Sequence, residues 1–196
     1  MTPNELLAYL GPALAYAALG TALLWPLWRA AAGGLDGRHA LTLFLVLFFL
    51  VLTQHPLPDR ATLDCGRGGM EPILRPFATL DHVERMWLIQ RDDPSIGLTR
   101  WLGNKVIQAA VMNFTLCALI GAAFARHAGG RRPFLTALAF GVLLSGGAEL
   151  MQLTGLFGLY PCAWRTFETD DLILNVGGLM AGFAIMRKWT GTARFH

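Results

Sequence analysis

Residues 40–54 read ALTLFLVLFFLVLTQ, a stretch without a single charged side chain. Four further stretches are similarly apolar and nearly free of charge: residues 6–28, 106–125, 134–153 and 172–186. A helix needs about 20 apolar residues, within a range of about 17–25, to cross the hydrocarbon core of a bilayer. The runs at 40–54 and 172–186 reach this length only together with their flanks. Because backbone polar groups cannot stay unpaired in lipid, and because the runs lack a two-residue alternation, we predict helices rather than a barrel.

The overall composition agrees with this interpretation. Charged residues make up 15% of the 196 positions and hydrophobic residues 54%, whereas soluble domains carry about 25% charged residues. A disordered chain is excluded, because it has few apolar residues and many charges. Of the 29 charged residues, 16 basic and 13 acidic, only Glu149 falls inside the five runs. We therefore expect an all-α integral membrane protein, a bundle of about five transmembrane helices.

The connections between the runs carry charge unevenly. Eight basic residues lie after the first, third and fifth runs: Arg29, Arg38, Arg126, Arg131, Arg132, Arg187, Lys188 and Arg194. Asp36 is the only acidic residue among them. Short cytoplasmic connections are rich in Lys and Arg, so we predict that the N-terminus is outside and the C-terminus cytoplasmic. No basic residue precedes Arg29, which favours an uncleaved anchor over a signal peptide for the first run.

The net charge of +3 does not indicate a nucleic-acid partner. A nucleic-acid-binding face is a basic patch on a soluble surface. Here the basic residues mark helix ends, where anionic lipid headgroups are the natural neighbours. We therefore expect membrane lipids, and no nucleic acid, as partners.

Residues 55–105 form a long extracytoplasmic segment in this topology. It is rich in proline and in charges of both signs, and we predict short helices at 81–90 and 96–102. Thr79 or Asp81 is the expected N-cap of the first of them, and the segment is expected to lie on the membrane as a cap. The histidines are scattered, so we expect neither a metal nor a cofactor. This gives three parts: the first two transmembrane helices (1–54), the cap segment (55–105) and the last three helices (106–196).

Two cysteines fall on the predicted outer side. Cys65 lies in the cap segment and Cys162 in the last outer loop, whereas Cys117 lies inside an apolar run. In an oxidising compartment Cys65 and Cys162 are expected to form a disulfide, and two free thiols are the alternative. Cys117 is expected to be a small buried apolar residue.

Polar side chains gather near the outer ends of the last two runs. The candidate polar site contains Glu149, Gln152, Arg165, Asp170, Asp171 and Asn175. Small residues beside them are expected to pack the helices closely: Ser145, Gly146, Gly147, Gly178 and Gly182. Gly178 and Gly182 have the GxxxG spacing, which we expect to bring Glu149 and Asn175 within reach. Two interpretations stay open, a structural network between helices and a ligand or catalytic site.

These residues carry a resemblance to a known family. Residues 149–152 (ELMQ), then Arg165, then residues 170–178 (DDLILNVGG) resemble the signature of the VanZ-like membrane proteins. That signature has an acid and a glutamine on one helix, a loop arginine, and then Asp and Asn leading into a glycine-rich helix. Pro76–Phe77 and Asn113 with Gly121 resemble further family positions, which adds Asn113 and Gly121 to the helix-packing residues. Cys117 and Leu119 stand where the family pattern has Phe and Pro.

The resemblance covers roughly residues 76–187 and makes 106–196 a VanZ-like three-helix core. It implies a multi-pass protein of the bacterial cytoplasmic (inner) membrane and a role in the cell envelope. It also implies an association with resistance to glycopeptide antibiotics of the teicoplanin type. The resemblance does not imply a settled molecular activity.

Three functional hypotheses follow. The first is a non-enzymatic protein that binds a lipid, a lipid-linked envelope precursor or a membrane-protein partner at the outer boundary, with Arg165 suited to a phosphate. The second is an enzyme acting on a phosphorylated amphiphile at the outer leaflet, with Glu149 or Asp171 as general acid or base. The third is an accessory subunit of a larger membrane complex. No nucleophile–base pair or metal set is evident in the sequence, which favours the non-enzymatic hypotheses.

Overall fold

The computed structural model describes residues 3–32, 36–55, 57–59, 63, 65–66, 70–93, 95 and 97–192. Its helices are α1 (Pro3–Ala32), α2 (Gly37–Gln54), α3 (Ala78–Asp92), α4 (Leu98–Leu102), α5 (Lys105–Ala125), α6 (Pro133–Leu153), α7 (Gly155–Gly158) and α8 (Thr169–Thr192). Within these residues no strand forms, and an isolated parallel bridge joins Ile73 to Glu168. Arg194 and position 96, where a short helix was expected to begin, lie outside the described residues.

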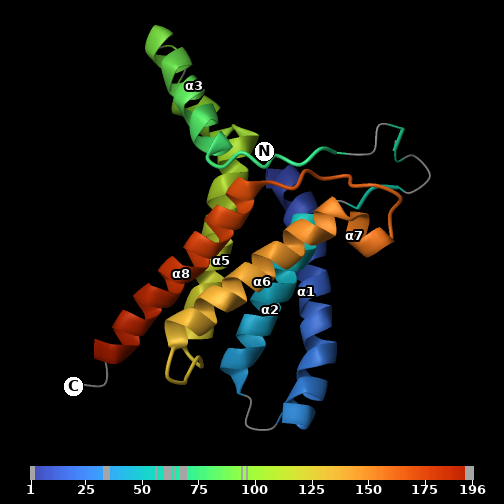
Figure 1. Ribbon diagram of the computed structural model, residues 1–196, viewed down its shortest axis with the longest axis vertical. Coiled ribbons are helices and arrows are strands. Elements are labelled where there is room, and N and C mark those ends of the chain that lie inside the picture. The colour runs from blue at the N-terminus through green and yellow to red at the C-terminus, as the bar shows by residue number, and fades with distance from the viewer. Residues whose placement is uncertain are drawn as a thin grey trace.

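Five helices of the described chain are long and apolar enough to cross a membrane. These spans are Leu10–Ala31, Gly37–Gln54, Lys105–Ala125, Pro133–Leu153 and Thr169–Thr190. They confirm the predicted all-α membrane fold with five spans, and the two short runs do extend into their flanks. Figure 1 shows α1, α2, α5, α6 and α8 running between two ends, with the N-terminus near one end and the C-terminus at the other.

The two ends of the bundle differ in what they carry. At one end, here called the site end, α2 and α6 finish and α5 and α8 begin. The opposite end holds the α1–α2 and α5–α6 turns, with Arg38 and Arg126 among the basic residues that flank them, and is here called the arginine end. The grouping of basic residues at one end agrees with the charge pattern, and the side of the membrane that each end faces stays a prediction.

The closest helix packing joins α5 and α8, which run in parallel from the site end. Three glycines lie where an added Cβ would overlap the backbone of the facing helix: Gly178 against Phe114, Gly182 against Ala118, and Gly121 against Leu179. Small residues permit this approach because no side chain separates the two backbones. The GxxxG pair therefore packs α8 against α5 rather than against α6, where we had expected it.

Gly146 and Gly147 of α6 behave differently. No atom lies within 4 Å of the position that a Cβ would take at either residue. The close packing expected at these two glycines is therefore absent. Ser145, beside them, is buried in the bundle and contacts α8 through a hydrogen bond described below.

The apolar core lies between α2, α5, α6 and α8. Its largest fully buried side chains include Phe49 and Leu52 of α2, Ile120 of α5, and Leu179 and Phe183 of α8. Helix α1 packs chiefly against α2, at the edge of this core. The core thus fixes α5, α6 and α8 around the site end.

The cap segment differs in part from the prediction. Helix α3 contains the predicted 81–90 helix, and α4 the described part of the second one. Figure 1 shows α3 extending away from the bundle rather than folding over its end. Neither Thr79 nor Asp81 is its N-cap: that residue is Phe77, at φ 65° and without a capping side chain of its own.

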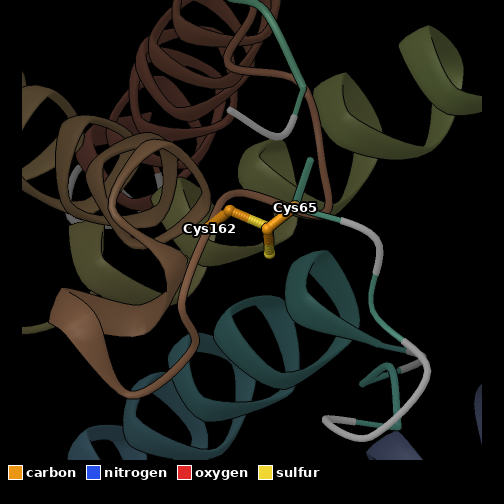
Figure 2. The surroundings of a disulfide bond; sticks show 2 residues. All are labelled: Cys65 and Cys162. Atoms are coloured by element: carbon orange, nitrogen blue, oxygen red, sulfur yellow. A yellow bond between two sulfur atoms is a disulfide. The ribbon is translucent and has the colours of Figure 1, made fainter. Parts of the chain in front are cut away.

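A disulfide closes the cap segment onto the last loop. Figure 2 shows Cys65, which follows α2, bonded to Cys162, which follows α7. Their Cα atoms are 5.8 Å apart, within the normal range for a disulfide. The predicted pairing is confirmed, and Cys117 is a buried free thiol.

Candidate functional site

The loop between α7 and α8 pairs with the cap segment at the site end. The Ile73 N–H donates to the Phe167 carbonyl at 2.8 Å, and the Thr169 N–H donates to the Ile73 carbonyl at 3.1 Å. Nearer the disulfide, the Met70 N–H donates to the Ala163 carbonyl at 3.1 Å. These bonds and the disulfide hold two segments, which are far apart in sequence, side by side over the bundle end.

Glu149 of α6 binds this loop through a hydrogen bond. It lies near the end of α6 with only 2% of its surface exposed. Its Oε2 accepts the Glu168 backbone N–H at 3.0 Å. A buried carboxylate is costly unless it accepts hydrogen bonds, so this contact gives Glu149 a structural role in placing the start of α8.

Arg165 and Gln152 both reach the end of α2. Arg165 Nη1 donates to the His55 carbonyl at 2.8 Å, and Gln152 Nε2 donates to the Thr53 carbonyl at 3.1 Å. Among the described residues, Arg165 forms no ion pair within 4 Å with Glu149 or with the acids that follow it, Glu168, Asp170 and Asp171. The arginine is thus positioned by a backbone carbonyl and keeps other N–H donors.

Asp170 supplies the missing cap of α3. Its Oδ2 accepts the Thr79 N–H at 2.6 Å and its Oδ1 accepts the Phe77 N–H. The side chain is buried, with 5% exposed. A carboxylate that accepts the first free N–H groups of a helix is the usual chemistry of an N-cap, here provided by another helix. Pro76–Phe77 and Asp170, two parts of the family resemblance, therefore meet in space.

Deeper in the bundle, polar side chains join α5, α6 and α8. Asn175 Nδ2 donates to Ser145 Oγ at 3.1 Å, and Cys117 Sγ lies 3.5 Å from Asn175 Oδ1. One turn nearer the site end, the Asn113 amide hydrogen-bonds to Asp171. Asn175 thus contacts the helix of Glu149 through Ser145, one turn away from Glu149 itself. These contacts connect helices and favour a structural role for Asn113, Ser145 and Asn175.

A cavity of about 340 Å³ opens between these elements. Among the described residues, its charged lining consists of Lys105 and Arg165, which are basic, and Glu168 and Asp171, which are acidic. Gln152 adds an amide, whereas the first turns of α5 add an apolar wall that includes Ala109 and Ala110. Mixed polar and apolar walls at a helix end are suited to a ligand that has both characters.

Three of the six predicted polar-site residues line this cavity: Gln152, Arg165 and Asp171. Glu149, Asp170 and Asn175 do not line it. They form hydrogen bonds that hold the segments around the cavity in place. Lys105 and Trp164 line the cavity and were not predicted. The signal for Lys105 was its place directly before an apolar run, on the side that otherwise has few basic residues near the helix ends.

The electrostatics of the cavity centre on Glu168. Burial raises the pKa of its carboxyl, the neighbouring carboxylates of Asp171 and Asp170 raise it further, and Arg165 opposes them. Among the described residues, no group of three or more His, Cys, Asp or Glu side chains is arranged to hold a metal ion.

Comparison with known proteins gives the chain a family. The model of the VanZ/LLP1 family matches residues 41–190, which include α5, α6, α8 and the cavity between them. No curated protein and no solved structure matches the chain. The match covers well over half of the sequence and agrees with the resemblance seen around Glu149 and Asp170. The chain belongs to the VanZ/LLP1 family of membrane proteins.

Proposed function

We propose that this protein binds the headgroup of a membrane amphiphile, a lipid or a lipid-linked envelope precursor, in the cavity at the site end. The observation that carries the proposal is a charged wall facing an apolar wall at the end of a membrane-spanning bundle. A headgroup requires the charged wall, and the first carbons of its chains require the apolar one. The volume of about 340 Å³ is at the lower end for small-molecule sites, which suits a headgroup rather than a whole lipid.

The cations of the cavity support binding over a purely structural network. Lys105 forms no ion pair with any described residue. Arg165 uses one N–H group on the His55 carbonyl, and a guanidinium has five. Neither cation is committed to a charge pair between helices: Lys105 is exposed and Arg165 is half-buried, so both are accessible to a headgroup. Both cations are suited to a phosphate.

The predicted topology places this cavity at the outer leaflet of the inner membrane. A protein that binds a lipid-linked precursor there would act on the cell envelope, which is how we connect the fold with teicoplanin-type resistance. A membrane-protein partner, as in an accessory subunit, would meet the same end of the bundle through α3. These cellular roles belong to the proposal and follow from the binding step.

The test is lipid binding to the purified, delipidated protein, measured by native mass spectrometry with phosphatidylglycerol and phosphatidylethanolamine. Lys105→Ala is the primary variant, because Lys105 is exposed and forms no ion pair with a described residue. We expect roughly tenfold weaker binding, equal to a lost charge-assisted contact of about 1.4 kcal/mol. Arg85→Ala, which removes an exposed arginine of α3, is the matched control and should bind as the parent does. Full binding by folded Lys105→Ala and Arg165→Lys would contradict the proposal.

A further inference from the structure

Among the residues that the structure describes, the charged lining of the cavity has two residues of each sign. None of Lys105, Arg165, Glu168 and Asp171 forms an ion pair within 4 Å with another described residue. The Glu168 carboxylate accepts no hydrogen bond from the described residues, and Asp171 has the Asn113 amide as its partner. The described part of the lining is thus balanced in charge and offers side chains of both signs that form no ion pair with a described residue.

A simple anion fits this lining poorly. A phosphate attracted by Lys105 and Arg165 would also meet the carboxylates of Glu168 and Asp171. Glu168 and Asp171 are half-buried, so water screens this repulsion only in part. Glu168 directly precedes α8 and Asp171 lies in its first turn, and both line the same cavity. A positive group between these carboxylates and a negative group on the two cations would satisfy the whole lining.

From this arrangement we infer that the cavity takes a zwitterionic phospho-amphiphile: a phosphate on Lys105 and Arg165, and a primary ammonium on Glu168 and Asp171. The inference rests on the proposed function and names the class of headgroup. A primary ammonium has three N–H donors for the carboxylates. A trimethylated ammonium has no N–H donor and is wider, so it is excluded from this position. The apolar wall of α5 takes the start of the acyl chains.

The titration of Glu168 supports this assignment. Burial and the carboxylates of Asp171 and Asp170 raise the pKa of Glu168, so protonation is the other way in which the site relieves its excess of negative charge. A bound ammonium and a proton therefore compete for the same carboxyl. Acidification is expected to weaken the binding of an ammonium headgroup and to leave, or strengthen, the binding of a plain phosphate headgroup.

The experiment compares four lipids on the full-length, delipidated protein in neutral detergent: phosphatidylethanolamine, its N-acetylated form, phosphatidylcholine and phosphatidylglycerol. We expect phosphatidylethanolamine to bind at least fivefold more tightly than the other three. Soluble phosphoethanolamine, which has the headgroup without chains, should not compete at the same concentrations. Equal competition by it would overturn the assignment to an amphiphile in favour of a free metabolite.

Variants of the cavity residues then test which side chains contact the ammonium of the headgroup and which contact its phosphate. Glu168→Gln keeps the backbone N–H that binds Glu149 and should abolish the preference for phosphatidylethanolamine over phosphatidylglycerol. Lys105→Ala should weaken both lipids alike and leave the ratio unchanged. Glu84→Gln, an exposed acid of α3, is the matched control. Asp171→Asn provides a second variant should Glu168→Gln lower the melting temperature.

The outcomes separate this inference from the proposed function. Phosphatidylglycerol binding as tightly as phosphatidylethanolamine, or a preference that survives in Glu168→Gln and Asp171→Asn, overturns the zwitterion and leaves headgroup binding in place. Absence of binding by all four lipids overturns both. Loss of the preference on acidification of the parent protein supports the placement of the ammonium, and a preference that acidification leaves unchanged contradicts it.

Discussion

Helices α8 and α1 are both long and apolar, yet they are held in different ways. About a third of the α8 span is buried, against 11% of the α1 span. In α8, Gly178 and Gly182 bring the backbone against α5, and Asn175 bonds to α6. In α1, Leu7 and Leu23 remain 69% and 62% exposed.

The difference shows that apolarity and packing are separate properties. A lipid tail is as apolar as leucine, so a leucine-rich helix gains little by leaving lipid for a neighbouring helix. Small residues and polar contacts between helices supply the specific attachment that α8 has. The family match begins at residue 41, after α1. The helices that are joined by small residues and polar contacts, α5, α6 and α8, thus lie in the part of the chain that the family model covers.

The largest effect should separate two glycine substitutions. In Gly182→Ala the new Cβ would overlap the Ala118 carbonyl, and α5 and α8 must move apart. We expect a loss of about 3 kcal/mol, the upper part of the range for overpacking. In Gly20→Ala the nearest atom is the end of the flexible Leu47 side chain, at 3.1 Å. That change should stay within about 1 kcal/mol, because alanine also favours the helix.

The measurement is reversible unfolding of both variants in the same detergent. Equal losses of stability would show that α1 and α8 pack equally tightly against their neighbouring helices and would contradict the difference described above. Gly146→Ala on α6, with open space around the glycine, should be neutral or slightly stabilising.

The next largest effect concerns the loop that leads into α8. Reducing the disulfide, or Cys65→Ser, should lower stability by about 2–4 kcal/mol, because the unfolded chain is no longer closed between residues 97 positions apart. We expect the site end to open first, since the Met70–Ala163 and Ile73–Phe167 bonds lie beside it. Hydrogen exchange of these amides, with and without reductant, is the measurement. A Cys65→Ser/Cys162→Ser protein serves as control and should not respond to reductant.

A smaller effect tests the structural role of Glu149. Glu149→Ala leaves the Glu168 N–H without its acceptor, and we expect a loss of about 1–3 kcal/mol. Glu149→Gln keeps an oxygen that accepts this bond and should lose less. Thermal unfolding together with exchange of the Glu168 amide measures both. If Gln and Ala were equally destabilising, the hydrogen bond would not be what holds the start of α8.

The smallest effect lies at the arginine end, where α2 meets the end of α5. The His127 ring stacks on His39 at 4.0 Å and its Nε2 lies 2.9 Å from Thr42 Oγ1. Burial lowers the pKa of His127, the proximity of His39 and Arg38 lowers it further, and Asp36 opposes this. Its contribution to stability is thus present above the unfolded pKa of about 6.5 and is lost as the pH falls from there through the lower folded pKa.

Between pH 7.5 and 5.5 we expect the melting temperature of the parent protein to fall further than that of His127→Gln. The raised pKa of Glu168 acts with the opposite sign, because stability then falls as pH rises. That contribution is common to both proteins, so the difference between them isolates His127. An identical pH dependence in the two proteins would show that the histidine pair does not attach α2 to α5.

Much of the fold was predictable because its signals are local. A run without charge, such as 40–54, predicts its own span through the cost of burying charge in lipid. Cys65 and Cys162 were paired from topology alone. The N-cap of α3 was predicted wrongly because its acceptor, Asp170, lies on another helix, far away in sequence. The prediction that the GxxxG pair packs against α6 was wrong for the same reason. The spacing shows that one face of the helix packs closely, but it does not show which helix packs against that face.

The amino-acid sequence by itself determined how many segments are candidate membrane-spanning helices and which residues are polar near one end. These are properties of short segments in contact with lipid, where each backbone group must find its partner within its own helix. Only the tertiary structure decided which polar residues support and which line a cavity. Glu149 and Asp170 bind backbone N–H groups, whereas Lys105, Arg165, Glu168 and Asp171 surround a cavity. That division depends on contacts between distant segments, which no local pattern contains.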